Sequence, residues 1–307
     1  MSSKTMIAVV GPTAIGKTKL AIHLAKHFQT EIISADSRQF FKEMKTGTAV
    51  PSSEELHAVR HHFIQHKSIF ESYSVGDFEK DAIDLLDKLF QEMDHAVLVG
   101  GSGLYVDAVV NGLDEFPDVD PKIRVHLNQK LHEQGLPALQ EELKTRDPKY
   151  YAIVDIKNPH RIIRALEVCI AAEKPYSSFL NQQKTKRNFD TLYVGIEANR
   201  EIIYDRINQR VDLMMEEGLL NEAEKLYPQR NLNALQTVGY RELFEYFDGN
   251  ITLDFAISEI KKNTRRFAKR QLTWLRKNKN VLWLKYDENL DEILKKITEH
   301  LHTDCNG

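Results

Sequence analysis

Short apolar runs alternate with amphipathic stretches over the first third of the chain. The apolar runs are rich in β-branched residues, which is typical of buried strands, and the amphipathic stretches have apolar residues at helical spacing. Strands are predicted at 6–10, 31–35 and 96–99, and helices at 18–28, 78–93 and 104–110. Strands that alternate with helices in this way predict a parallel sheet with helical crossovers.

The pattern changes between residues 112 and 189, where amphipathic stretches at 119–143 and 159–172 are separated by turn signals without a convincing strand. Strand character then returns. Further strands are predicted at 191–196 and 281–284, and further helices at 200–217 and 219–227. We therefore predict a discontinuous α/β core domain, residues 1–111 and 190–307, interrupted by an all-helical insertion domain, residues 112–189.

Length and composition limit the class of protein. The 307 residues suffice for a sizeable core, and two cysteines are too few for a disulfide framework or a zinc site. No apolar run approaches the roughly 20 residues of a membrane span, so we expect a cytoplasmic protein without membrane partners. A monomer is a separate expectation. A net charge of −3 argues against a uniformly basic nucleic-acid binder.

The first predicted strand runs into a segment with the pattern G-x-x-x-x-G-K-T, which is that of a phosphate-binding loop. Its glycines let backbone N–H groups surround an anion, Lys17 adds a positive charge, and the Thr18 hydroxyl is suited to bind Mg²⁺. The predicted diphosphate- or nucleotide-binding residues are Gly11, Pro12, Thr13, Ala14, Ile15, Gly16, Lys17 and Thr18. The predicted fold is therefore a P-loop-type parallel sheet flanked by helices.

Asp36 follows the second predicted strand, at the sheet edge where ligands bind in open parallel sheets. A carboxylate there suits a general base or a partner of Mg²⁺. Asp before Ser is equally typical of an Asx turn or a helix cap, so its spacing alone leaves both roles open. The strand at 96–99 ends without an acidic residue, which weakens the interpretation as an ATPase.

Residues 261–279 contain nine Lys or Arg residues and no Asp or Glu, together with Phe267 and Trp274. Such a run is usually a solvated helix face. Without acidic partners, and ahead of a buried strand, it is also what a surface that binds a polyanion requires. RNA is therefore a candidate partner.

Nine sequence blocks follow one another along almost the whole chain. They are GPTAIGKT (11–18), SADSRQ (34–39), GTAVP (47–51), HH (61–62), YSVGDF (73–78), GGSGLY (100–105), NPHRIIRALEV (158–168), TVGYRE (237–242) and TRRFAKRQLTWLR (264–276). In this order they resemble the tRNA dimethylallyltransferase family, also called tRNA isopentenyltransferases. With two cysteines the chain cannot carry the zinc finger of the eukaryotic relatives, and it resembles the compact bacterial form.

The resemblance implies a prenyl transfer. The N6 amine of adenosine 37, beside the tRNA anticodon, attacks C1 of dimethylallyl diphosphate and releases diphosphate, with Mg²⁺ as cofactor. Asp36 is implied as the general base, and Lys17, Thr18 and Ser102 as further catalytic residues, with Thr18 on the metal. Ser102 stands where the family usually has Thr, so the hydroxyl is kept, and Ile15 replaces a common small Ser, which affects local packing.

The resemblance also implies contacts to tRNA. Structural alternatives stay open, because Arg161 and Arg164 can pair with Glu167 on one helix, and Gly239–Tyr240 can be a turn. The implied tRNA-binding residues are Asp36, Ser37, Arg38, Gln39, Ser102, Arg124, His160, Arg161, Ile162, Ile163, Arg164, Gln236, Thr237, Val238, Gly239, Tyr240 and Arg241.

Two other functions account for part of the sequence. A P-loop kinase of a small metabolite or nucleoside shares the loop and an Asp after the second strand, but it gains nothing from the basic run. A non-catalytic RNA-binding module leaves the loop and Asp36 without a role. The expected partners are therefore the anticodon stem-loop of tRNA and dimethylallyl diphosphate.

Overall fold

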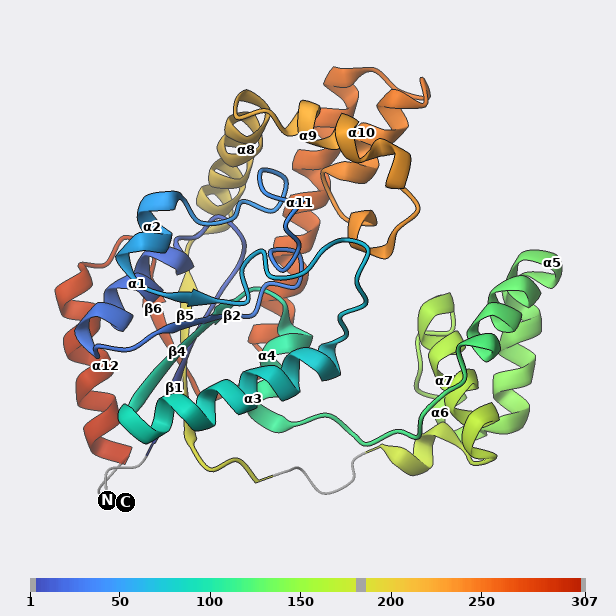
Figure 1. Cartoon of the computed structure of the whole chain (residues 1–307), viewed down its shortest axis with the longest axis horizontal. Coiled ribbons are helices and arrows are strands. Elements are labelled where there is room, and N and C mark those ends of the chain that lie inside the picture. The colour runs from blue at the N-terminus through green and yellow to red at the C-terminus, as the bar shows by residue number, and fades with distance from the viewer. Residues whose placement is uncertain (1–3, 181–185, 305–307) are drawn as a thin grey trace. The chain divides into compact units, whose positions relative to one another are not determined.

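A computed structural model describes residues 4–180 and 186–304, and the chain divides into two compact units (Figure 1). Unit 1 comprises Met1–Val110 with Arg187–Gly307, and unit 2 comprises Asn111–Lys186. The sequence pattern places these boundaries at 111/112 and 189/190. In the described ranges, no helix combines the length and the apolar character needed to cross a membrane.

Unit 1 is built on six parallel strands in the order β3-β2-β4-β1-β5-β6, which confirms the predicted parallel sheet. The strands are β1 Thr5–Val10, β2 Ile32–Ser34, β3 His61–His62, β4 His95–Gly100, β5 Asp190–Glu197 and β6 Val281–Lys285. β1 is central and all six of its residues are buried. The expectation that residues 281–284 form a buried strand was wrong, because β6 lies at the sheet edge and only Leu284 is buried.

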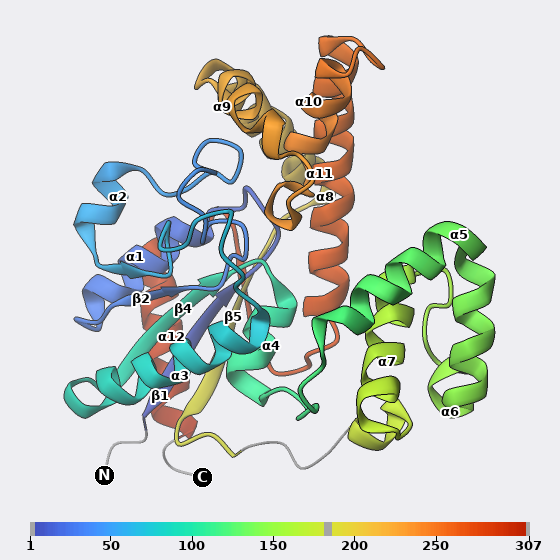
Figure 2. The ribbon, with the colours of Figure 1, turned by 45° about the vertical axis from the view of Figure 1, so that its right-hand side comes forward.

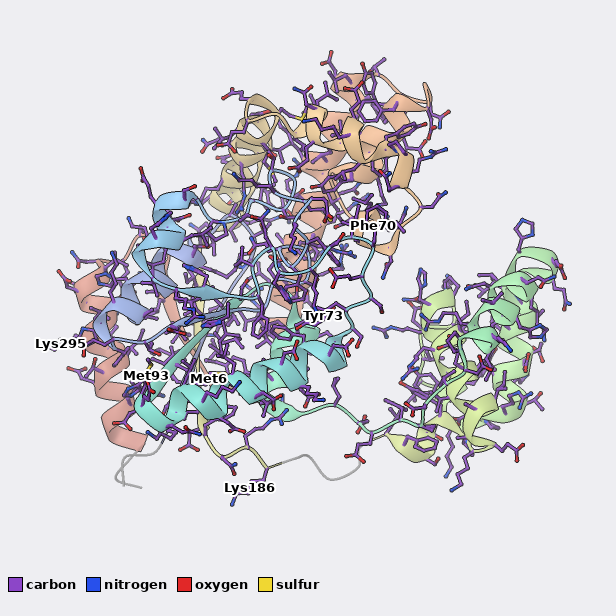
Figure 3. The ribbon with its side chains drawn as sticks, in the orientation of Figure 1. Met6, Phe70, Tyr73, Met93, Lys186 and Lys295 are labelled. Atoms are coloured by element: carbon purple, nitrogen blue, oxygen red, sulfur yellow. The ribbon has the colours of Figure 1, made fainter. Side chains whose placement is uncertain are left out.

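Helices cover both faces of the sheet because alternate side chains of a strand point to opposite faces. On one face, Ile7 and Val9 of β1 pack in a core with α1 (Lys17–His27) and α12 (Leu290–Asp304). On the other face, Met6 and Ala8 pack with α3 (Val75–Glu92) and α4 (Gly103–Asn111); Met6 is labelled in Figure 3. The loops that leave the carboxyl ends of the strands are thereby held on a rigid base.

A second group of helices in unit 1 surrounds a core of its own. It consists of α8 (Arg200–Glu216), α9 (Leu219–Leu226), α10 (Tyr240–Phe247) and α11 (Leu253–Leu275). Figure 2 shows α8, α9 and α10 gathered beside the upper part of α11. α8 and α11 run antiparallel, because Lys261 pairs with Asp212 at 2.6 Å and Arg265 donates to Asn208 at 2.7 Å. Short elements complete the unit: α2 Ser53–Ala58, η2 Tyr227–Gln229 and η3 Asn233–Leu235.

Unit 2 is helical throughout its regular elements in the described ranges. α5 (Pro121–Arg146) bends at Gly135, where φ is 75° and ψ is 175°, and packs against α7 (Pro159–Ala172). Its core consists of aliphatic residues from these two helices. The short elements are α6 Pro148–Tyr151 and η1 Tyr176–Phe179. The predicted helices at 119–143 and 159–172 correspond to α5 and α7.

Candidate active site

The phosphate-loop segment, residues 11–18, connects β1 to α1 at the carboxyl edge of the sheet. Gly16 precedes α1 with φ 108°, in the left-handed region that favours glycine. Ile15 is buried in the core and anchors the loop. Within the described residues, no side chain caps α1 at Gly16 and its first turn holds no acid, so its N–H groups are available to an anion.

Lys17 and Arg210 bring two half-buried positive charges close to Asp36. The Lys17 ammonium donates to the carbonyl oxygen of Pro12 at 2.8 Å. Burial lowers the pKa of Lys17 to about 8; the Asp36 carboxylate opposes this shift and Arg210 adds to it. Burial also lowers the pKa of Arg210, again against the effect of Asp36. Lys17 and Arg210 carry two positive charges beside the single negative charge of Asp36, and both cations are partly removed from water. This arrangement favours the binding of an anion.

Asp36 forms the turn that was one of its two predicted roles. Its Oδ1 accepts the backbone N–H of Arg38 at 3.2 Å, which is the contact of an Asx turn. The residue also lines a cavity, and an ionised carboxylate has further acceptor positions. The turn therefore orients Asp36 without excluding a role in proton transfer. Beside it, the N–H of Ser37 donates to Ser102 Oγ at 3.2 Å, and the two hydroxyl groups are 3.3 Å apart.

Arg38 and Gln39 use their side chains to hold neighbouring backbone. The guanidinium of Arg38 donates to the carbonyl oxygens of Asn233 and Ala234, each at 3.0 Å. The amide of Gln39 donates to the carbonyl oxygens of Thr48 and Ala49 at 3.1 and 3.0 Å. Both side chains therefore shape the walls of the site, and Arg38 also lines its cavity.

Two adjoining spaces lie in front of the phosphate loop, both in unit 1. The larger is a cavity of about 580 Å³, and the smaller is a polar pocket of about 60 Å³ that Lys17 and Thr18 line. Four residues line both spaces: Thr13, Asp36, Thr48 and Arg210. A ligand bound at the phosphate loop and a second ligand in the large cavity therefore share one boundary, at which Asp36 lies.

The small pocket suits Mg²⁺ bound mainly by phosphate oxygens and water. The Thr18 hydroxyl and the Asp36 carboxylate are oxygen donors, and Mg²⁺ in phosphate sites usually takes only one or two protein ligands. The described residues hold no cluster of three or more His, Cys, Asp or Glu that could bind a metal. His61 is bonded through Nδ1 to the carbonyl oxygen of Val59, and His62 pairs with Glu31.

The segment 236–241 forms the opposite wall of the large cavity. Five of its residues line this space: Gln236, Thr237, Val238, Gly239 and Arg241. Tyr240 is fully buried behind them, so the structure leaves its side chain no direct contact with a ligand in the cavity. The turn alternative is partly right, since Gly239 has φ 101°, but the chain continues from it directly into α10.

Most of the predicted basic run lies on α11, and its side chains lie in two environments. One face lines the cavity with Ile260, Thr264, Phe267, Arg270, Gln271 and Trp274. The expectation that the run lacks acidic partners was wrong, because Lys261 pairs with Asp212 at 2.6 Å and Lys262 with Glu259 at 2.8 Å. The exposed cations of the run lie further along it and are Arg266, Lys269, Arg270, Arg276, Lys277 and Lys279.

The predicted tRNA contacts of unit 2 fall into three groups. His160 and Arg161 are exposed on the first turn of α7. Ile162 and Ile163 are buried in the core of unit 2, so their side chains are not exposed to a ligand such as tRNA. Arg124 forms a two-pronged ion pair with buried Glu167, and Arg164 lies 3.7 Å from the same carboxylate. The ion-pair alternative thus holds for Arg164, while Arg161 stays exposed.

Arg210 and Gln271 are among the cavity residues that the predicted site residues did not include. Arg210 lies on the same face of α8 as Ile207, Val211 and Met214. A charged residue within an apolar helical stripe was the available signal. Gln271 is buried and joins two loops, because its Oε1 accepts the Thr13 N–H and its Nε2 donates to the Gly101 carbonyl, each at 2.9 Å. Gln271 lies in the block at 264–276, where the surrounding basic residues suggest RNA and not the phosphate loop.

Comparison with known proteins adds a family and a fold. The family model described as IPP transferase matches residues 39–278. A tRNA dimethylallyltransferase of Flavobacterium johnsoniae is 59% identical over 304 residues, which cover 97% of this chain and 98% of that protein. Another, of Christiangramia forsetii, is 61% identical over 301 residues, with 98% and 100% coverage.

Solved structures agree with these sequence matches. The tRNA isopentenylpyrophosphate transferase of Bacillus halodurans is 38% identical and superposes with a TM-score of 0.74 over 99% of this chain and 98% of its own. A eukaryotic dimethylallyltransferase acting on tRNA, at 24% identity, has a TM-score of 0.83 over 98% of this chain and 80% of its own. At that identity the second likeness concerns the fold alone.

Proposed function

The chain belongs to the tRNA dimethylallyltransferase family, and from this premise we propose that it prenylates adenosine 37 of tRNA. The dimethylallyl group comes from dimethylallyl diphosphate, and the N6 amine of the base receives it. The observation that carries the proposal is the shared boundary of the two spaces, where Thr13, Asp36, Thr48 and Arg210 line both. The diphosphate occupies the small pocket at the loop, and the nucleobase enters the large cavity.

The reaction places Asp36 between donor and acceptor. The N6 lone pair attacks C1, the C1–N6 bond forms, and the electron pair of the breaking C1–O bond leaves with the diphosphate. Asp36 takes the N6 proton as general base, held in place by its Asx turn. Ser37 and Ser102, whose hydroxyl groups are adjacent, supply hydrogen bonds to the base.

Negative charge grows on the diphosphate as the allylic bond breaks. Lys17 and Arg210 are half-buried cations that line the small pocket and stabilise that charge. The N–H groups at the start of α1 act in the same direction. The Thr18 hydroxyl would help to hold Mg²⁺, which would supply further stabilisation of this charge.

The large cavity also has apolar walls. Ile207, Val211 and Met214 of α8 and Ile260 of α11 contribute apolar side chains to its lining. Such apolar walls cover the dimethylallyl group and keep water from the reacting carbon.

Binding of tRNA uses surfaces that differ in chemistry. Residues 236–241 line the cavity that receives the flipped base. Exposed Arg266 and Lys269 of α11 face solvent and suit phosphate contacts. In unit 2, exposed His160 and Arg161 are available for the same purpose, so we propose that this helical insertion also contacts tRNA.

The test compares two group transfers by the same preparation. The protein is incubated with labelled dimethylallyl diphosphate and unmodified tRNA, and in parallel with γ-labelled ATP and a panel of nucleosides. We expect label on tRNA that depends on an adenosine at position 37 and disappears when it is replaced by guanosine. Phosphate transfer from ATP without any prenyl transfer would favour the P-loop kinase.

A further inference from the structure

The carboxylate of Glu222 holds the loop segment 45–49 by accepting hydrogen bonds from its backbone. Glu222 of α9 accepts three consecutive backbone N–H groups, those of Lys45, Thr46 and Gly47, at 3.0, 2.8 and 2.8 Å. Its Oε1 also accepts the hydroxyl of Tyr240 at 2.7 Å. Four donors therefore converge on one side chain, which matches the roughly four lone-pair positions of a carboxylate.

Tyr240 packs against the segment and holds the carboxylate. Its side chain is fully buried, and burial together with the neighbouring Glu222 charge raises the pKa of its hydroxyl, which therefore stays a donor. The ring lies so close to Gly47 that a Cβ there would come within 2.5 Å of it. Only glycine fits at this position, so the segment and Tyr240 have one mutual arrangement.

The segment that Glu222 holds is the wall between the two spaces of the active site. Thr48 lines both spaces, and Ala49 lines the large cavity. Their carbonyl oxygens accept the Gln39 amide at 3.1 and 3.0 Å, and the Ala49 carbonyl is also 3.4 Å from Arg210. A shift of the segment would therefore move two residues that flank the reacting groups.

We propose that Glu222, held by Tyr240, is a positioning residue for the transfer reaction. It keeps segment 45–49 in place so that the diphosphate pocket and the nucleobase cavity retain their common wall. This inference rests on the proposed function, since the distance it controls is that between donor and acceptor. Tyr240 directly follows Val238 and Gly239, which line the cavity, so the same carboxylate ties the wall to the tRNA-binding segment.

The decisive variant is Glu222→Gln, because it preserves size and removes acceptor capacity. An amide offers one oxygen and turns its NH₂ group toward donors, so at least one backbone N–H of the segment loses its partner. Glu224→Gln is the matched control, two residues away on α9 with an exposed side chain. Tyr240→Phe removes one of the four hydrogen bonds and keeps the three from the backbone.

We expect Glu222→Gln to lower kcat about 10- to 100-fold, since small misplacements of reacting groups have effects of this order. Tyr240→Phe should have a smaller effect in the same direction. The dissociation constant for tRNA should stay within about twofold, because the phosphate contacts are untouched. Hydrogen exchange at the amides of residues 45–47 should accelerate in Glu222→Gln but not in Glu224→Gln.

Kinetics separate positioning from mere stabilisation. If Glu222→Gln melts at a lower temperature but keeps the wild-type kcat well below that temperature, the positioning role is overturned. Unchanged exchange at residues 45–47 would overturn it as well. Should Glu222→Gln fail to fold, the kcat of Tyr240→Phe decides in the same way. If the wild-type enzyme transfers no dimethylallyl group, the proposed function itself is contradicted. If the wild type is active and Glu222→Gln is equally active, only the positioning role is contradicted.

Discussion

The phosphate loop and α11 both line the active-site cavity, yet they are encoded in different ways. The loop is a run of eight consecutive residues, 11–18, whose geometry follows from its own glycines and from β1 and α1 on either side. α11 contributes one face, on which Ile260, Phe267 and Gln271 are separated by helical spacing. The chemistry of the loop is therefore local, whereas the chemistry of α11 depends on what each face meets.

Gln271 makes the difference concrete. It lies in a basic stretch that suggests an RNA-binding surface, but its amide joins the N–H of Thr13 to the carbonyl of Gly101. One helix thus supports the phosphate loop with one face and presents Arg266 and Lys269 to solvent with another. The substitutions below test whether residues near the phosphate loop determine kcat and whether the exposed face of α11 determines the affinity for tRNA.

The largest effect is expected at Asp36, beside the phosphate loop. Asp36→Ala should lower kcat about 10²- to 10⁴-fold, the usual range for a lost general base. Binding of tRNA should change little, because the exposed cations remain. Single-turnover transfer and tRNA binding are measured on the same preparation, with Asp36→Asn as the variant that keeps the turn. Turnover at the wild-type rate would remove Asp36 from the chemistry.

Lys17 should make diphosphate binding depend on pH. Its pKa of about 8 means that the ammonium is charged below this pH and loses its proton above it. Affinity for dimethylallyl diphosphate should therefore fall as pH rises through about 8. Lys17→Met should bind roughly 10- to 100-fold more weakly, as expected for a lost hydrogen bond to a charged group, and with a flatter pH profile. Isothermal titration over pH 6–10 provides the measurement, and an equally steep profile in the variant would contradict the assignment.

The exposed face of α11 should affect affinity and not chemistry. Replacing Arg266 and Lys269 together by Ala should weaken tRNA binding and reduce the slope of log K against log salt by roughly one unit for each phosphate group that is no longer neutralised. The value of kcat at saturating tRNA should be retained. Binding is followed by fluorescence anisotropy at several salt concentrations. If the slope does not change, this face is only solvated.

The smallest effect is expected at Lys261, which belongs to the same basic run but pairs with Asp212. Lys261→Ala should lower the free energy of unfolding by about 0.2–1 kcal/mol, as for other partly exposed ion pairs. It should leave the salt dependence of tRNA binding unchanged. Denaturant unfolding and the anisotropy titration check the two parts. A reduced salt slope here would show that the ion pair opens when RNA binds.

Sequence patterns predicted the elements that have a regular hydrophobic pattern over many residues, and those marked by a motif of consecutive residues. The central strands at 6–10, 96–99 and 191–196 and the helices at 159–172 and 200–217 agree closely with β1, β4, β5, α7 and α8. Short elements such as α2 and β3 were not predicted, because six or two residues show too little periodicity. α10 and α12 were also missed, and both depend on packing against distant residues for their place in the fold.

The candidate site shows the same division. Residues 11–18 and Asp36 were accessible to sequence analysis, because a strand end and a glycine-rich turn determine their geometry over a few residues. Arg210, Gln271 and Glu222 were not, since their roles arise from hydrogen bonds to segments 161, 258 and 175 positions away. Ile162 and Ile163 show that a sequence block can mix roles. The block 158–168 contributes exposed residues at the start of α7, but these two residues belong to the core of unit 2.

By itself, the sequence determined the phosphate loop, the parallel sheet that supports it and the family to which the chain belongs, because each depends on consecutive or regularly spaced residues. Only the tertiary structure decided which cations stay exposed on α11, which acidic residues pair with the others, and how Glu222 and Tyr240 hold the wall between the two spaces. These features depend on side chains brought together from distant segments, and burial, not spacing, determines what they can bind.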